Sequence, residues 1–372
     1  MVLGTSAVLP SVNKPYPIAS SPHAPAPKIQ VAILLDVSNS MDGLIEQAKA
    51  QLWNMVSVLG KAKCNNVVPQ IQIALYEYGR DNNPKTEGYV KQISPFTGDL
   101  DGVSKNLFSL TTNGGDEFCG HVIYTSISDL KWDTAASNYK VIFIAGNEDF
   151  LQGDITYSKA CSAAKDKGVI VNTIYCGDRQ QGIREHWNLG SECGNGSFTN
   201  INPNARFEEI PTPYDSTLMV LNGKLNSTYI SYGYMGSAFL SQQDEMDKAN
   251  TSLSPSVMAK RVQVKGKAQL YNNSSWDVVD ALSKDDKAIE KLDFKTLPDS
   301  LQKKSKKEVE AIVRKKSTER TGIRKEIETV SNQREAFLVE ARKKNKANTP
   351  TLETEMEKII RQQAGRFRMV IE

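Results

Sequence analysis

The amino-acid sequence predicts an α/β domain, built on a mainly parallel sheet, with a mainly helical C-terminal extension. Residues 28–205 alternate short apolar runs with segments whose apolar residues recur at helical spacing, which is typical of a parallel sheet. From about residue 299 the chain is strongly charged, and its apolar residues recur mostly three, four or seven positions apart, which indicates amphipathic helices. With 372 residues there is room for one large domain plus an extension, or for two domains.

Six strands are expected in the first part of the chain. Each is a short run of apolar, β-branched or aromatic residues, and the runs span 30–35, 71–78, 89–96, 141–145, 169–175 and 196–201. The run at 89–96 follows a polar turn at 80–85. We therefore expect it to pair with 71–78 as a hairpin-like neighbour.

Helices are expected between these strands, at 44–59, 100–110, 122–130, 157–167 and 182–189. The first has Leu44, Ala48, Leu52 and Met55 on one face, so it can pack on a sheet. The fourth ends before Gly168, and glycine is common directly after a helix.

The C-terminal part is expected to be mainly helical. A short helix fits residues 218–225, whereas 258–271 fits either a helix or a pair of strands. The long charged segment at 299–346 has an apolar seam that Arg320 and Arg334 interrupt, which disfavours a long two-stranded coiled coil. Pro350 after Thr349 predicts the start of a last helix. We expect these last two helices to form an antiparallel hairpin.

These patterns divide the chain into four segments. We expect a leader and Pro-rich linker at 1–27, the α/β domain at 28–207, a linker and mixed segment packing on that domain at 208–298, and the helical hairpin at 299–372. The apolar start at 1–9 fits the tail of a truncated secretory signal, which would place the protein outside the cytoplasm, periplasmic or secreted. A flexible leader is the alternative.

Composition argues against several classes of function. The net charge of +3 is too small to indicate nucleic-acid binding, and no apolar run reaches the roughly 18 residues of a membrane span. The three histidines, His23, His121 and His186, form no recognisable catalytic pattern with a nucleophile. Cys119 lies two residues before His121, which permits a dyad or a zinc site, but a role on a helix face is favoured. Five cysteines permit a disulfide that includes Cys176, or free thiols throughout.

The most informative motif follows the first strand. The apolar run ends in Asp36, and Ser38 and Ser40 follow at alternate positions, where the strand opens into a loop. A carboxylate and two hydroxyls suit a hard divalent cation such as Mg²⁺, with Mn²⁺ or Ca²⁺ as alternatives. In the competing interpretation, the same side chains cap the following helix and hydrogen-bond the loop without any metal.

This Asp-x-Ser-x-Ser motif after an apolar strand resembles the metal-ion-dependent adhesion site of von Willebrand factor A domains. The resemblance implies a doubly wound, Rossmann-like sheet, with the metal at the carboxyl ends of the strands. It also implies two more loops, which usually supply a Thr and an Asp. Here Asp116 stands at the Thr position, and Gly146 stands at the Asp position. Asn147 or Glu148 can reach the site instead, directly or through water.

The chain is also similar to a bacterial branch of A-domain proteins with Gly-Gly-Asp-Glu and Ala-Gly-Asn-Glu in these two loops. The expected metal ligands are Asp36, Ser38, Ser40, Asp116, Asn147 and Glu148. The resemblance implies a non-enzymatic module that binds a protein partner through a metal. Two alternatives stay open: an assembly component of a cell-envelope complex that acts through the C-terminal helices, and a metal-dependent hydrolase.

Overall fold

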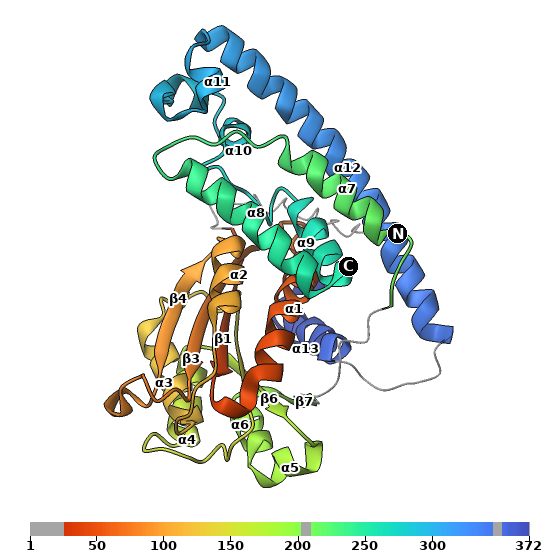
Figure 1. The fold of residues 1–372 in the computed structure, drawn as a ribbon. Coiled ribbons are helices and arrows are strands. Elements are labelled where there is room, and N and C mark those ends of the chain that lie inside the picture. Colours follow the sequence, from red (N-terminus) through yellow and green to blue (C-terminus); the bar gives the residue numbers. More distant parts are fainter. Residues whose placement is uncertain (1–25, 202–209, 345–351, 372) are drawn as a thin grey trace, which may run out of the picture.

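The structure, a computed structural model, describes residues 26–201, 210–344 and 352–371. Six strands form the central sheet in the order β4-β3-β1-β5-β6-β7 (Figure 1). Their bounds are β1 (Lys28–Asp36), β3 (Gln70–Tyr78), β4 (Lys91–Thr97), β5 (Tyr139–Gly146), β6 (Ile170–Cys176) and β7 (Asn195–Ile201). All neighbours are parallel except β3 and β4. The predicted fold class is confirmed, and each expected strand lies within two residues of its observed bounds.

The strand order places the loop after β1 beside the loop after β5. β1 pairs with β3 on one side and with β5 on the other, so the crossovers from β1 run in opposite directions along the sheet. This reversal is the topological switch point of a doubly wound fold, where ligands usually bind. Val31 pairs with Ile73 and with Val141, so the centre of the sheet is apolar on both sides of β1.

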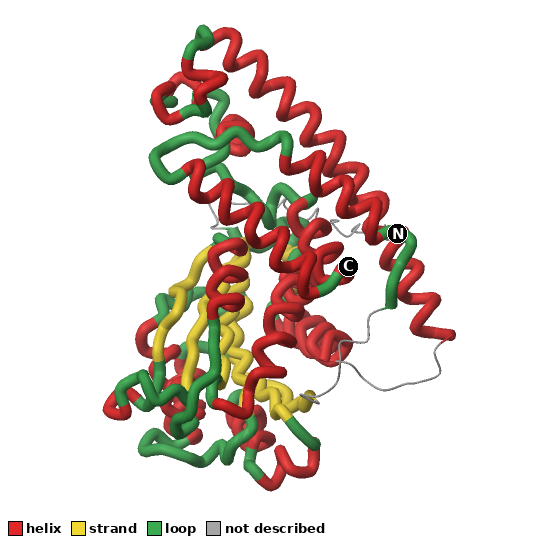
Figure 2. Tube along the Cα trace, viewed as in Figure 1, coloured by secondary structure: helices red, strands yellow, loops and turns green. Residues whose placement is uncertain are grey.

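Helices cover both faces of the sheet (Figures 1 and 2). One apolar core joins the sheet to α1 (Asp42–Leu59), α2 (Leu100–Ser109) and α13 (Leu352–Arg366). A second core joins the opposite face to α3 (Cys119–Asp129), α4 (Tyr157–Asp166) and α6 (Trp187–Cys193), with α5 (Arg179–Arg184) beside α6. Each expected helix is present, and the segment at 182–189 is divided between α5 and α6.

The part of the chain after residue 210 is helical, as expected. Its helices are α7 (Asp215–Asn226), α8 (Gly236–Leu253), α9 (Pro255–Lys265), α10 (Val278–Lys284), α11 (Asp299–Gln302) and α12 (Lys306–Lys344). The ambiguous segment at 258–271 begins as a helix. Ser254 accepts hydrogen bonds from two amides of α9, and Pro255 occupies its first turn, so local sequence explains where α9 starts. Short 3-10 turns η3 (Ala288–Lys291) and η4 (Phe294–Thr296) join α10 to α11.

The packing of the last helix differs from the expected antiparallel hairpin. Among the described residues, α12 packs along α7, α9 and α10, whereas α13 packs on α1, β7 and β8 (Met369–Ile371). Strand β8 also pairs with β2 (Ala62–Cys64), which follows α1. Gln363 of α13 hydrogen-bonds Tyr139 and Asn172 of the sheet. The apolar face of α13 therefore covers the α/β domain instead of α12.

The arginines of α12 that interrupt its apolar seam are buried and paired. Arg320 lies 2.6 Å from Asp277 and 2.7 Å from Asp280, and Arg334 lies 2.7 Å from Asp215. They join α12 to the rest of the helical region through ion pairs, where a coiled coil would use apolar contacts. This explains why the seam is interrupted without loss of packing.

The five cysteines are all free thiols, and Cys176 is buried at the end of β6. Within the described residues, no helix is both long and apolar enough to span a membrane. The leader, apart from its last two residues, and the boundary near 207 lie outside the described residues. The expectation of a secretory signal and an extracytoplasmic location therefore stays a prediction.

Candidate functional site

Asp36 ends β1 and is completely buried. Its Oδ1 accepts a hydrogen bond of 2.8 Å from the amide of Ser38. Its Oδ2 is buried and has no hydrogen-bond partner among the described residues. Burial raises the pKa of Asp36 to about 7, and the negative charge of Glu148 adds to the rise. One oxygen of this carboxylate is thus without a partner in the described part of the chain.

A row of polar atoms leads from Asp36 to the surface. The hydroxyls of Ser38 and Ser40 lie 3.2 Å apart, and the Ser40 hydroxyl donates to Oδ1 of Asn147 at 3.3 Å. Ser38 is buried and Ser40 is exposed, so the row opens to solvent. The structure brings together four of the predicted ligands: Asp36, Ser38, Ser40 and Asn147.

Of the competing interpretation, the helix cap is absent and the hydrogen bonds within the loop are present. After the short turn η1 (Asn39–Met41), helix α1 has Met41 at its N-cap position, and no side chain caps it. The Asp36 carboxylate instead closes a turn within its own loop, on the amide of Ser38. The two hydroxyls bond each other and Asn147, so they are not used on the helix end.

The second loop, residues 111–118, is held against the first. The amide of Asn113 donates to the carbonyl of Val37 at 2.9 Å, and the amide of Asp81 donates to the carbonyl of Gly114 at 2.5 Å. A Cβ on Gly115 would lie 2.7 Å from the carbonyl oxygen of Gly79, so only glycine permits this close approach. The paired glycines of the motif thus have a structural reason.

Asp116 and Glu117, at the end of this loop, point in different directions. Asp116 is exposed, and its carboxylate lies 3.6 Å from Nζ of Lys85. Glu117 is buried, and a Cβ built on Gly79 would lie 2.9 Å from Cγ of Glu117 and 2.8 Å from Oδ1 of Asp36. The two carboxylate side chains therefore flank the same glycine, and Glu117 is a site residue that the sequence comparison missed.

Glu117 is linked to Asp36 electrostatically. Burial and the negative charge of Asp36 together raise the pKa of Glu117 to about 8. No periodic pattern in this irregular loop distinguishes Glu117 from Asp116, so the sequence carries no signal that could have identified it.

The geometry of the third loop explains why position 146 holds a glycine where the resemblance implies an aspartate. A Cβ on Gly146 would lie 2.5 Å from Oη of Tyr78 and 3.1 Å from Oδ2 of Asp36. The Tyr78 hydroxyl donates to the carbonyl of Ala145 at 3.0 Å and so occupies the space of a side chain. Glu148 is exposed, and its backbone carbonyl accepts from Nε1 of Trp187 at 2.7 Å. Its charge still raises the pKa of Asp36 and of Glu117.

We call residues 36–41, 111–118 and 146–149 the loop face. Asp36 and Glu117 are buried there, and the exposed Glu148 is near enough for its charge to raise the pKa of both. In the part of the chain that the structure describes, no group of three or more His, Cys, Asp or Glu side chains forms a ready metal cage. The donor set instead mixes carboxylates, hydroxyls and an amide oxygen. Such a set can hold a hard cation or, without one, an extra proton.

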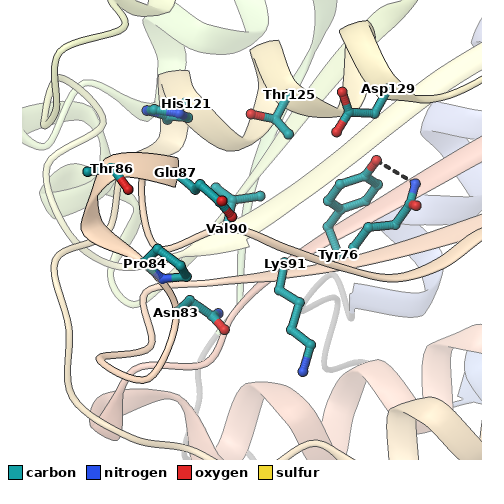
Figure 3. Close-up of a pocket in the computed structure, with 11 residues that line it drawn as sticks. Tyr76, Asn83, Pro84, Thr86, Glu87, Val90, Lys91, His121, Thr125 and Asp129 are labelled. Carbon is teal, nitrogen blue, oxygen red and sulfur yellow. Dashed lines mark hydrogen bonds between the residues drawn. The ribbon is translucent and has the colours of Figure 1, made fainter.

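A separate cavity of about 450 Å³ lies beside the loop face, between η2 (Lys85–Glu87), the start of β4 and α3 (Figure 3). His121, Thr125 and Asp129 face it from successive turns of α3, and Nε2 of Gln92 donates to Oη of Tyr76 at 2.7 Å. None of the predicted metal ligands lines it. His121 therefore has the helix-face position that we favoured, while Cys119 is buried beside Tyr78.

No protein-family model matches the sequence, and no curated protein matches it. The solved structures reported below each cover about half of this chain. BatB from Bacteroides thetaiotaomicron is 16% identical over 47% of this chain and 90% of its own, with a TM-score of 0.36. A von Willebrand factor type A protein from Catenulispora acidiphila is 14% identical over 48% of this chain and 39% of its own, with a TM-score of 0.35.

A third match is the proximal thread matrix protein 1 of the mussel byssus, described with a zinc-occupied adhesion-site motif. It is 12% identical over 47% of this chain and 42% of its own, with a TM-score of 0.35. Likenesses this remote carry no argument about function. The sheet order with its one antiparallel edge strand shows a doubly wound, Rossmann-like α/β fold.

Proposed function

We propose that the loop face binds a divalent cation, Mg²⁺ in the first place and Mn²⁺ or Ca²⁺ as alternatives, and that it engages a protein partner through this ion. The observation that carries the proposal is the buried, unpartnered Oδ2 of Asp36. An ionised carboxylate without a partner in a buried position costs several kcal/mol. A bound cation would offset this cost, and no side chain of the described residues does so.

The residues present fit such an ion. Asp36 would hold it through Oδ2, and the hydroxyls of Ser38 and Ser40 would add neutral oxygen donors. Asn147 bonds the Ser40 hydroxyl and would orient it. When bound, the ion supplies a positive charge that an oxygen atom of a partner can share.

The open end of the site supports binding of a partner. Ser40 and Glu148 are exposed, so an ion there would be reached from solvent. Asp36, Glu117 and Tyr78, in contrast, are buried and keep the inner side closed. A site with one open side is suited to hold an ion between two molecules.

A thermal-shift measurement on the full chain tests the proposal. We expect millimolar Mg²⁺ to raise the melting temperature of the wild type, because an ion that binds only the folded state stabilises it. Asp36→Asn should abolish this rise, while Asp244→Asn, at an exposed position of α8 in the helical region, should keep it. A wild type that shows neither a shift nor a calorimetric signal with any of the three ions would refute the metal site.

A pull-down tests the partner. Capture of a protein by the wild type should be lost in EDTA and in Asp36→Asn. Capture that survives both treatments would favour assembly through the C-terminal helices instead. Turnover of generic ester or phosphate substrates that requires the metal would favour the hydrolase.

A further inference from the structure

We propose that Glu117 supplies a second carboxylate to the cation, so that the chain completes the charge around the ion without an acidic group from a partner. This inference rests on the metal site proposed above. It differs from the sequence resemblance in two respects. The residue is Glu117 instead of Asp116, and the partner that fits the site has neutral oxygen donors instead of a carboxylate.

The geometry of Gly79 places the two carboxylates together. Gly79 directly follows β3 with a φ of +80°, a conformation that favours glycine. The Asp36 and Glu117 side chains lie on it so closely that a Cβ would contact both, at 2.8 Å and 2.9 Å. Because Gly79 lacks a side chain, nothing separates the two acidic groups.

The burial of the two groups points to a shared ligand. Glu117 is 6% exposed and Asp36 is 0% exposed. Oδ1 of Asp36 faces Gly79 beside Glu117, and the unpartnered Oδ2 of the same carboxylate faces Gly146. Two buried carboxylates without a cationic neighbour among the described residues are stable as a pair when a cation lies between them.

Asp116 provides the contrast on the same loop. It is exposed and has its own cation, Lys85, at 3.6 Å. Its charge is therefore already screened by solvent and by a neighbour. Two adjacent residues thus differ: Asp116 is exposed beside a lysine, and Glu117 is buried with no ion pair among the described residues.

The charge balance decides which partner fits. Asp36 and Glu117 together offset the two charges of a divalent ion, and Glu148 adds a further negative charge nearby. A third carboxylate brought by a partner would meet net negative charge and would be repelled. Hydroxyl, amide or backbone carbonyl oxygens would carry no such penalty.

Calorimetric titration of MnCl₂ into the full chain tests the assignment. We expect Glu117→Gln, which keeps shape and removes charge, to weaken Mn²⁺ binding at least about tenfold, the range seen when groups around a metal are removed. Asp116→Asn, the matched control, should stay within about twofold of the wild type because that side chain is outside the site. In EDTA the melting temperature of Glu117→Gln should be higher than that of the wild type, which also shows that the variant folds.

The outcomes separate this inference from the metal site itself. Wild-type affinity in Glu117→Gln together with lost affinity in Asp36→Asn would overturn the role of Glu117 and leave the metal site intact. Wild-type affinity in both variants, or no binding by the wild type, would overturn both.

Acetate tests the partner class: it should increase the Mn²⁺ affinity of Glu117→Ala and leave that of the wild type unchanged. An equal increase in the wild type would contradict a charge-complete site.

Discussion

Acidic side chains are buried in two regions of the molecule, and only one of the two regions pairs them with cationic side chains. In the helical region Asp247 lies 2.6 Å from Nε of Arg261 and 2.8 Å from Nζ of Lys265. In the loop face Asp36 and Glu117 have no cationic partner among the described residues. Burial by itself acts to raise the pKa of all three carboxyl groups. At Asp247 this effect is outweighed by Lys265 and Arg261, which hold its pKa well below the usual range. Asp36 keeps its raised pKa.

This contrast distinguishes a structural charge cluster from a binding site. Arg261 also lies 2.6 Å from Asp101 of α2, so its cluster joins the helical region to the α/β domain with every charge compensated. In the loop face, the carboxylates of Asp36 and Glu117 are also buried, but no cationic side chain of the described residues compensates their charges. The absence of such a pair at the loop face, among the described residues, is the reason why we propose a cation there.

The largest effect should come from breaking the compensated cluster. Arg261→Met would leave Asp101 and Asp247 buried with one cation fewer, and removal of one partner from a buried ion pair costs about 3–5 kcal/mol. We expect urea denaturation to show a loss of this size. Arg314→Ala, which removes an exposed pair with Glu310, should cost about 0.5 kcal/mol or less. Similar losses in both variants would show that the buried cluster is not special.

Removal of charge at the loop face should have the opposite effect on the free energy of unfolding. In EDTA, Asp36→Asn removes a buried, uncompensated charge, so we expect a gain of about 1–3 kcal/mol in the free energy of unfolding. With Mg²⁺ present the order should reverse, because only the wild type gains from the ion. Denaturation with and without metal measures both. Destabilisation by Asp36→Asn in EDTA would mean that the carboxylate already has a partner.

The pH dependence of the two regions should also differ in sign. The folded-state pKa of Asp36 is raised from 3.8 to about 7, so the folded state binds more protons, and in EDTA its contribution falls as pH rises through this window. The pKa of Asp247 is lowered, so its contribution is present above 3.8 and is lost as pH falls through the folded pKa. Relative to Asp36→Asn, the wild type should lose stability between about pH 4 and 7. A flat difference would contradict the raised pKa.

The smallest effect should come from the exposed pair at the edge of the loop face. Lys85 and Asp116 are 71% and 51% exposed, so Lys85→Ala should change the free energy of unfolding by less than about 0.5 kcal/mol. It should also leave the metal-dependent shift in melting temperature unchanged. A large loss of that shift would place Asp116 in the site after all.

The sequence predicted the sheet more fully than the helical region. Strand patterns such as that at 71–78 are local, and their neighbours follow from the doubly wound order. The partner of an amphipathic helix is not local. Met356, Ile359 and Ile360 give α13 an apolar face that fits α12 and α1 equally well, and only the folded chain selects α1. Arg320 looked like an interruption of a seam because its partner, Asp277, is 43 residues away.

At the candidate site, the motif predicted the residues of the first loop and not the second. Asp36 ends β1, and Ser38 and Ser40 follow within four residues in the tight loop before α1, so the local sequence alone brings them to one place. Asp116 and Glu117 are adjacent acidic residues in an irregular loop, and no period tells which one turns inward. The packing of Gly115 on Gly79 decides this, and a motif comparison does not include it.

The central claim is that a cation lies between Asp36 and Glu117. Crystals of the full chain grown with MnCl₂ test it directly, because manganese is located by its anomalous scattering. We expect a peak within coordination distance of Oδ2 of Asp36 and of the Glu117 carboxylate, with Asp116 still directed toward Lys85. A loop face without a peak in crystals that hold Mn²⁺ elsewhere, or a peak bound by Asp116 and not by Glu117, would contradict the account.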